Sequence, residues 1–403
     1  MVRLIETDIN EEEVHPFNKL YLGILCHDNA VFDLSWSPDD HQIATASGDQ
    51  SARVFDVVTQ VCTNVLAGHR SSVKQVAFSP RNPSILTTCA RDGNIHFFDT
   101  RCVGTASSLG KNIVENRPVN SILQAHAETG PKKGVTARSD ISVTAAAWLI
   151  NRDNVIATAC ESNSCIKIWD IRSIQTRRKV ASAVEMSATP PHHQPPKHRP
   201  FGLNCLSLSL DGSRMYAMCR DSVIYAYSTS HVSNGPIHAY SHPRLHASTF
   251  YVKTSVSQDG RLLGAGSSDG IAVIFPTDER YLDQHSYRLG KVHPDDSTPT
   301  PASPPSSLTP KPTVPSPPAA SRKSPFPVAQ HMKVGKGVGL IRGHAKEVTD
   351  VTWTVIGDLV AISDDFQARC WRNDNGDGKA EELRVQGSEQ GRGWGCGWAE
   401  RAC

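Results

Sequence analysis

Signals that would mark a membrane, metal-binding or phosphate-binding protein are missing from this sequence. It has no apolar run near 18 residues, so we expect no membrane-spanning helix, and its polar, acidic N-terminal stretch does not resemble a signal peptide. The 11 cysteines are scattered without a Cys-x-x-Cys pair, which favours buried, reduced thiols in an intracellular protein over a zinc site. No Gly-rich phosphate loop or metal-spaced His cluster stands out, so we predict neither a metal nor a cofactor.

An excess of charge of one sign is also lacking. The chain of 403 residues carries 42 Lys and Arg against 40 Asp and Glu, a formal net charge of +2. This balance argues against steering of the whole protein onto DNA or a membrane surface. We therefore expect no membrane partner and no direct, sequence-specific binding of nucleic acid. Length alone suggests two or three domains, but repeat folds break that rule.

What the sequence does contain is a repeated unit of short strands. The clearest copy spans 68–101 and alternates apolar and polar residues in three stretches, which are separated by turns at 79–82 and at Asp92-Gly93. Such a unit cannot bury both faces alone and needs copies beside it. The copies share an Asp, or once an Asn, six residues before an aromatic residue: Asp49…Phe55, Asp92…Phe98, Asn163…Trp169, Asp221…Tyr227, Asp269…Phe275 and Asp365…Trp371.

This pattern resembles the WD40 repeat, in which Gly-His is followed by Trp-Asp at a period of about 40–45 residues. Trp169-Asp170 is the one literal Trp-Asp pair, and a His precedes several copies: His27, His69, His246 and His344. An ordinary β-sandwich with regular turns is the alternative, which six copies of the marker disfavour. The resemblance implies an all-β fold, a seven-bladed WD40 β-propeller with six complete blades and a partial first blade.

We expect the propeller blades to occupy residues 27–372. Residues 1–26 would supply only the third and outer strands of the first blade, at 2–7 and 19–26, because its first two strands are absent from the sequence. The first complete unit would have strands near 30–36, 42–47, 51–56 and 60–66.

The spacing between markers predicts where the blades are interrupted. Long loops are expected at 102–138 and 173–200, and a Pro- and Ser-rich insertion near 278–338. Its densest part, 294–327, cannot bury enough surface to offset the entropy of ordering, so we expect disorder there and in a tail at 373–403. The insertion offers proline-directed kinases six sites, with an unregulated linker as the alternative: Thr298, Thr300, Ser303, Thr309, Ser316 and Ser324.

Some residues superficially resemble hydrolase sites, namely Ser47 with Asp49 and His27, Ser267 with Asp269, and Ser363 with Asp365 and His344. Repetition favours structure over catalysis, because a catalytic site occurs once. The resemblance implies that the turn Asp, the Ser or Thr two residues earlier and the loop His form a buried network that ends on a Trp indole. Phe cannot donate, which leaves that donor at Trp169 and Trp371 only. We therefore expect no enzymatic activity.

Two third strands end in the same pattern, Phe98-Asp99-Thr100-Arg101 and Trp169-Asp170-Ile171-Arg172, and the other repeats lack this Arg. Adjacent blades should place Arg101 and Arg172 side by side on one face. Each Arg could merely pair with its neighbouring Asp at the surface, where ion pairs contribute little. Two in adjacent repeats resemble the paired WD-x-Arg motif of cullin-4 substrate receptors. The resemblance implies that Asp99, Arg101, Trp169, Asp170 and Arg172 dock on the damaged-DNA-binding-protein adaptor.

Further stretches are similar to the denticleless family, and the resemblance spans roughly 27–372: residues 27–34, 46–50, 91–95 with 99–102, 248–253, and 343–349. It implies a non-catalytic, nuclear substrate receptor of a cullin-4 RING ubiquitin ligase. Its substrates would carry degrons of replication proteins bound to the sliding clamp, which are ubiquitinated in S phase or after DNA damage and degraded by the proteasome. The clamp, PCNA, would be contacted indirectly, because the sequence has no Gln-x-x-aliphatic-x-x-aromatic-aromatic box. The alternative is a WD40 scaffold for chromatin or complex assembly with no ligase link.

The face that carries the Asp turns lies opposite the arginine pair and is the expected substrate surface. Arg and aromatic side chains are frequent binding hot spots, and an acidic residue would suit a basic flank of the degron. Phe250 could instead pack under a loop, and the arginines could be solvated; the loops at 102–138 and 173–200 are then the next place to look. The candidate residues are Asn29, Arg70, Arg91, Arg220, Phe250, Lys253 and Asp364.

Overall fold

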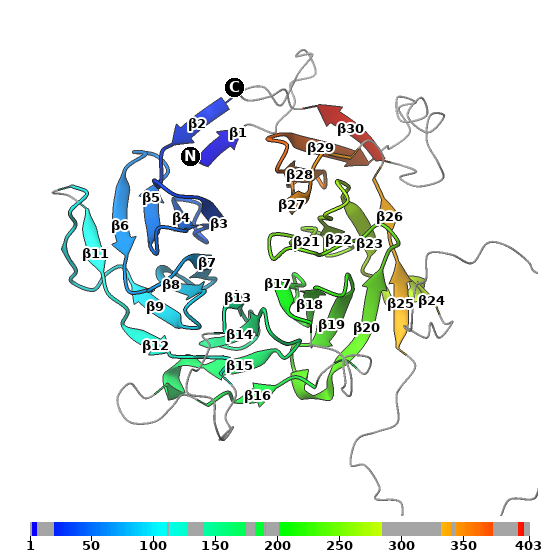
Figure 1. Ribbon diagram of the computed structural model, residues 1–403, viewed down its shortest axis with the longest axis horizontal. Helices are drawn as coiled ribbons and strands as arrows, with labels where there is room; N and C mark the ends of the chain where they lie inside the picture. The colour runs from blue at the N-terminus through cyan, green and yellow to red at the C-terminus, as the bar shows by residue number, and fades with distance from the viewer. Residues whose placement is uncertain are drawn as a thin grey trace, which may run out of the picture.

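The computed structural model places short strands in a ring. It describes residues 2–5, 20–110, 113–127, 141–174, 182–188, 190, 201–283, 332–340, 343–373 and 394–398. Their strands form seven sheets around a central axis (Figure 1). In each large sheet the first strand lies nearest the axis and the later ones follow outward, as in a β-propeller. The predicted all-β WD40 propeller is thus confirmed, and the count of seven blades stays a prediction.

Six sheets share a plan of four strands, each antiparallel to the next. The first two contain β3 (Val31–Trp36), β4 (Gln42–Ser47), β5 (Ala52–Asp56) and β6 (Cys62–Leu66), then β7 (Val73–Ser79), β8 (Asn82–Ala90), β9 (Ile95–Asp99) and β12 (Asn120–Ile122). The next two contain β13 (Val143–Trp148), β14 (Val155–Cys160), β15 (Lys167–Asp170) and β16 (Glu185–Met186), then β17 (Leu203–Leu208), β18 (Arg214–Cys219), β19 (Ile224–Ser228) and β20 (Pro236–Ser241). The last two contain β21 (Thr254–Val256), β22 (Leu262–Ala265), β23 (Val273–Pro276) and β26 (Val338–Gly339), then β27 (Val348–Trp353), β28 (Leu359–Ser363), β29 (Ala368–Asn373) and β30 (Trp394–Trp398).

The seventh sheet has only two strands, β1 (Val2–Ile5) and β2 (Leu20–Ile24), which pair antiparallel. It lies between the sheets that contain β3 and β27 (Figure 1). Both strands lie within the ranges expected from the sequence, and the partial first blade that they would form stays a prediction.

Apolar side chains of neighbouring sheets pack against each other and form the core. One cluster joins Ala44 and Val54 of one sheet to Val76 and Leu86 of the next, all almost fully buried. Burial between sheets explains why second strands such as β14 are buried along their whole length rather than alternating. The core therefore holds each sheet in place and leaves the strand ends and turns to form the two faces of the ring.

Several segments predicted to be irregular contain strands instead. The expected loop at 102–138 includes β12 and also β10 (Thr105–Ala106) and β11 (Val114–Asn116), and the loop at 173–200 includes β16. The tail at 373–403 includes β30, which pairs with β29 antiparallel. These predictions were wrong because short outer strands are held by backbone hydrogen bonds, which need no apolar alternation.

The bounds of the Pro- and Ser-rich insertion were also too wide. The range 278–338 contains β24 (Leu282–Asp283), β25 (Lys333–Lys336) and part of β26. β25 runs parallel to β20 and antiparallel to β24, so the chain leaves and re-enters the ring at one place on its outer rim (Figure 1). The disorder predicted for 294–327 lies outside the described residues.

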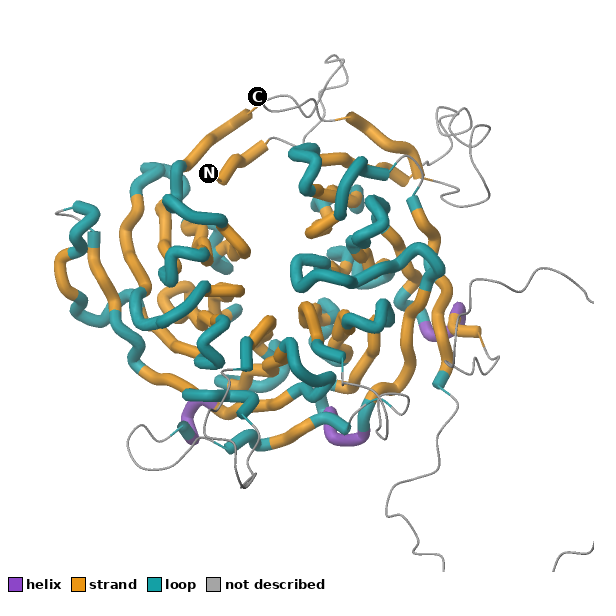
Figure 2. Tube along the Cα trace, in the orientation of Figure 1, coloured by secondary structure: helices purple, strands orange, loops and turns teal. Residues whose placement is uncertain are grey.

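Within the described residues, helix is confined to three short 3-10 turns in loops, as expected (Figure 2): η1 (Ile171–Ser173), η3 (Val232–Asn234) and η4 (Glu279–Tyr281). Among the described residues, no helix is long and apolar enough to cross a membrane.

Candidate functional site

The His, Asp and hydroxyl residues that resembled hydrolase trios form buried structural networks. His69 contacts the Asp92 carboxylate at 3.2 Å through Nδ1 and the Thr88 hydroxyl at 2.7 Å through Nε2. Burial opposes ionisation of Asp92, but hydrogen bonds from His69 and from the Arg70 backbone outweigh it and lower the pKa of Asp92 to about 2. His27, Thr45 and Asp49 repeat this arrangement.

The hydroxyl in these networks belongs to a different residue from the one predicted. It comes from the Thr four residues before the Asp, such as Thr45, whereas Ser47 donates to the Ala30 carbonyl and accepts from the Asp49 backbone. Ser267 and Ser363 likewise donate to backbone carbonyls. The strand geometry decides this, because a Thr inside the second strand faces the buried His while the Ser closes the turn.

A third network uses the donor predicted at Trp169, but the sequence reasoning missed its His and its hydroxyl. The Thr158 hydroxyl accepts from the Trp169 indole at 2.8 Å and contacts His126 Nε2 at 3.0 Å. Burial lowers the pKa of His126 to about 3, so the ring is neutral. No Gly precedes His126 and Asn163 replaces the turn Asp, so the usual signal was absent. The prediction of His246 was wrong: His246 is exposed, and its sheet has no such network among the described residues.

The last large sheet holds an incomplete version of the same network. His344 contacts the Asp365 carboxylate at 3.1 Å, but Ala361 occupies the position that corresponds to Thr158. The buried Trp371 Nε1 atom consequently finds no hydrogen-bond partner in the described part of the chain, and His344 has only the Ala361 backbone as a partner besides Asp365. The donor predicted at Trp371 exists, and its acceptor is missing.

The two predicted Asp-x-Arg motifs have the same geometry. Arg101 donates to Asp99 from Nε at 2.9 Å, from Nη2 at 2.7 Å and from the backbone at 3.0 Å. Arg172 makes the same three bonds to Asp170, at 3.0, 2.8 and 3.0 Å. Hydrogen bonds from its Arg hold the pKa of each Asp below the ordinary value. We call each Asp–Arg pair a fork. Its three hydrogen bonds preorganise the two side chains as one unit.

Both forks lie at the face opposite the Asp turns. β9 begins at Ile95, after the Asp92 turn, and ends at Asp99, roughly 13 Å further on at about 3.3 Å per residue. β15, the third strand of the adjacent sheet, ends at Asp170. The arginine side chains are 62% and 64% exposed, so they are accessible to a partner. A third fork, Asp278 with Arg280, was missed by the sequence reasoning. Its Asp comes three residues after the aromatic residue of the repeat, whereas the Asp of the other two forks follows the aromatic residue directly.

On the face of the Asp turns, three arginines lack carboxylate partners. Arg70 and Arg91 are exposed and Arg220 is half-buried, and none forms an ion pair with a described residue. By contrast, ten other arginines are paired, and two of them, Arg53 and Arg244, contact turn Asp residues on this same face: Arg53, Arg81, Arg101, Arg117, Arg152, Arg172, Arg214, Arg244, Arg261 and Arg280. The three unpaired residues are the three arginines that the sequence suggested for substrate binding, a role that stays a prediction.

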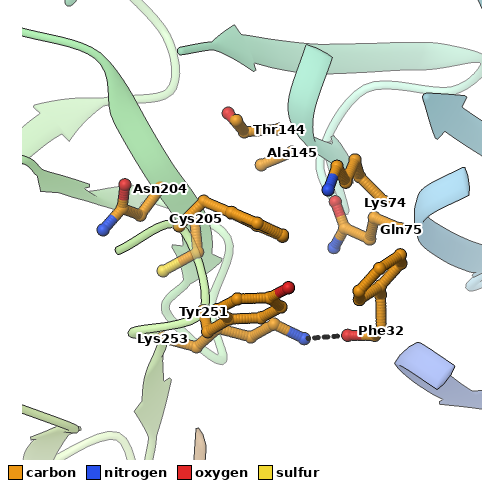
Figure 3. Close-up of a pocket in the computed structure, with 10 residues that line it drawn as sticks. Phe32, Lys74, Gln75, Thr144, Ala145, Asn204, Cys205, Tyr251 and Lys253 are labelled. Atoms are coloured by element: carbon orange, nitrogen blue, oxygen red, sulfur yellow. Dashed lines mark hydrogen bonds between the residues drawn. The ribbon is translucent and has the colours of Figure 1, made fainter. Parts of the chain in front are cut away.

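The other candidates on this face differ in availability. Phe250 is half-buried and stacks on Tyr251, with ring centroids 3.9 Å apart. Asn29 and Asp364 are both exposed. Lys253 reaches across the central channel to the carboxylates of Asp33 at 2.5 Å and Asp350 at 3.5 Å. It also donates to the Phe32 carbonyl, as Figure 3 shows.

The Lys253 ammonium is therefore already engaged within the fold. Burial alone would lower the pKa of Lys253, but the two carboxylates outweigh it and raise that pKa above its ordinary value. An ammonium that bridges β3 and β27 contributes to holding the ring together, which makes Lys253 the weakest of the substrate-binding candidates.

A small hollow, partly open to solvent, marks the mouth of the channel on this face. It is lined by residues near the first ends of the innermost strands, among them Phe32, Lys74, Asn204, Tyr251 and Lys253 (Figure 3). Sequence reasoning missed Lys74 and Tyr251. No group of three or more His, Cys, Asp or Glu within the described ranges is arranged to hold a metal ion.

Comparison with known proteins agrees with this fold. Residues 19–56, 60–99 and 335–372 match the family "WD domain, G-beta repeat". The first two matches run from the outer strand of one sheet through the third strand of the next, so each sequence repeat spans two sheets.

The chain is 33% identical over 399 residues to the cell division cycle protein cdt2 of Schizosaccharomyces pombe, covering 96% of this chain and 67% of that protein. It is 32% identical over 291 residues to denticleless protein homolog A of Xenopus laevis, with 68% and 38% covered, and 32% identical over 277 residues to the human denticleless protein homolog, with 66% and 36% covered. The chain thus spans two thirds of the yeast protein and well under half of these vertebrate relatives. It belongs to the denticleless/Cdt2 family of WD40 proteins.

Proposed function

We propose that this chain is the substrate-recognition subunit of a cullin-4 RING ubiquitin ligase and recruits clamp-bound replication proteins for degradation. Membership of the denticleless/Cdt2 family supports the coarser role, a WD40 substrate receptor of a ubiquitin ligase that acts in the cell cycle and in replication. Such receptors are generally non-catalytic. Other subunits would transfer the ubiquitin, and the work would take place in the nucleus.

The observation that carries the cullin-4 assignment is the pair of matching forks. Asp99–Arg101 and Asp170–Arg172 present the same bidentate geometry at corresponding strand ends of adjacent sheets. Exposed ion pairs contribute little to stability, so the fold does not require them. A repeated, exposed and rigid guanidinium pair is what a protein adaptor could recognise, and we assign it to the damaged-DNA-binding-protein adaptor. Trp169, 2% exposed, would support the second fork from within the core.

Co-purification with this adaptor tests the assignment. Wild-type chain should retain the adaptor, and the double variant Arg101→Ala with Arg172→Ala should lose it while its unfolding curve stays unchanged. Arg280→Ala is a matched control, because it removes a third exposed fork of the same chemistry and should leave adaptor binding intact. A wild-type chain that never binds the adaptor would overturn the cullin-4 assignment and favour a scaffold for chromatin or complex assembly.

Substrate capture should depend on the opposite face. Arg91 and Arg220 lack carboxylate partners there, and reversing their charge with Arg91→Glu and Arg220→Glu should abolish capture of a clamp-bound substrate while adaptor binding persists. Arg261→Glu reverses one exposed charge on a turn of the adaptor-side face and should leave capture intact. If capture survives the double reversal, the recognition surface lies elsewhere.

A further inference from the structure

Lys74 occupies an unusual position at the mouth of the central channel. Its Nζ atom lies 3.7 Å from the centre of the Phe250 ring and 4.4 Å from the centre of the Phe32 ring. The three residues come from β7, from β3 and from the segment before β21, which meet at this hollow. Two aromatic faces fix the ammonium in place, as cation–π contacts do.

The fixed ammonium has no counter-ion. Lys74 makes neither a hydrogen bond nor an ion pair with any residue of the described ranges; Glu161 acts on it only at longer range. Burial, and then the nearby Arg91, lower the pKa of Lys74. Lysines held inside proteins are ordinarily paired, as Lys253 is in the same hollow. The charge of Lys74 is thus held beside a second cation and left without a carboxylate.

The rest of the hollow is suited to a peptide. Asn204 lines it, and its Nδ2 atom donates to the Thr249 carbonyl, so this side chain is held in place within the fold. Phe250 and Tyr251 offer stacked rings beside Lys74 for an apolar side chain. Burial raises the pKa of the Tyr251 hydroxyl most, and the nearby carboxylates of Asp364 and Glu347 raise it further.

The mouth of the channel therefore has a basic side, with Lys74 and Arg91, and an acidic side beyond Tyr251. We propose that Lys74 is a specificity-determining residue, which seats the carboxylate of an Asp or Glu side chain of the recognised peptide between Phe32 and Phe250. This deepens the proposed function, because it rests on the Asp-turn face being the surface that reads substrates. A carboxylate would supply the missing counter-charge, and its side chain would lie against the aromatic rings.

Selection from a phage library of random 16-residue peptides tests the seat without a known substrate. Peptides selected on the full wild-type chain should share an Asp or Glu at one position. A fluorescein-labelled consensus peptide should bind at least about tenfold more tightly, by fluorescence anisotropy, than the same peptide with Asn or Gln at that position. Lys74→Met should remove this discrimination, and Lys74→Glu should select Lys or Arg there instead.

Lys346→Met is the control. Lys346 is an exposed lysine on the same face but outside the hollow, and its Nζ atom lies 5.8 Å from the centre of one ring, that of Phe366. It should leave the discrimination unchanged. Failure of the wild-type chain to select any peptide, selection without an acidic preference, or an unchanged preference in Lys74→Met would each overturn the proposal. Lys74→Met, Lys74→Glu and Lys346→Met should all retain the adaptor. The peptide experiment therefore tests the role of Lys74 independently of the adaptor test of the proposed function.

Discussion

Completing the defective network around Ala361 should stabilise the protein. Threonine at this position would place a hydroxyl between the His344 ring and the Trp371 indole, as Thr158 does between His126 and Trp169. The Trp371 indole, which now lacks a partner, would gain one, and such a buried group costs roughly 1–3 kcal/mol when unpaired. Part of that gain is offset by burying the hydroxyl. We expect the Ala361→Thr variant to exceed Ala361→Val by about 2 kcal/mol in free energy of unfolding.

Valine is the matched control because it has the shape of threonine without the hydroxyl. Ala361 is 0% exposed, so any strain from added volume is common to both variants and cancels in the comparison. Urea unfolding followed by tryptophan fluorescence measures the difference. The indole N–H signal of Trp371, one of 7 tryptophans, should shift and exchange more slowly with solvent in Ala361→Thr alone.

The converse change should have the converse effect. Thr158→Val strips the hydroxyl from the intact network and should lower the free energy of unfolding by about 2 kcal/mol. Equal stability of the Ala361→Thr and Ala361→Val variants, with an unmoved indole signal, would refute the reasoning. It would mean that the Trp371 indole N–H is already satisfied, for instance by a bound water.

Three further predictions concern the channel, acid and the insertion. Lys253→Met should cost about 2–4 kcal/mol in urea unfolding, because it strands the Asp33 carboxylate; Asp33→Asn should recover part of this loss, and no recovery would contradict the pairing. The pKa of His126 is lowered to about 3 in the folded state, so below about pH 6.5 the unfolded chain binds a proton on this ring that the folded chain does not. The free energy of unfolding should therefore fall as the pH decreases from 6.5, by up to ~1.4 kcal/mol per pH unit. His126→Gln should flatten this slope between pH 6.5 and 5. Deleting 294–327 should change the unfolding free energy little, because the cost of loop closure varies slowly with length; a loss of several kcal/mol would show that the segment packs.

Most of the fold could be predicted from the repeat marker. An Asp six residues before an aromatic residue predicted the third strand of each large sheet, from Phe55 in β5 to Trp371 in β29. Outer strands such as β12 and β30 were missed because backbone pairing to the strand before them, and not their own side chains, keeps them in place.

The candidate site was only partly visible for a different reason. Arg101 and Arg172 are readable because each is paired within three residues of chain. The role proposed for Lys74 depends on rings from two distant segments and on the lack of a paired carboxylate. Neither feature can be recognised from the residues next to Lys74 in the sequence. Likewise, Ser47 looked like a network member because it is nearer the Asp, whereas strand geometry selects Thr45.

The meeting of β24 and β25 on the outer rim has a practical consequence. These antiparallel strands place Leu282 opposite Gly335, so the chain departs and returns about 5 Å apart. Folded domains commonly have neighbouring termini that fit such a spacing. A fluorescent reporter could therefore replace the segment between these strands and project sideways from the ring. It would leave both flat faces uncovered, so that adaptor and peptide binding could be followed simultaneously on one labelled molecule.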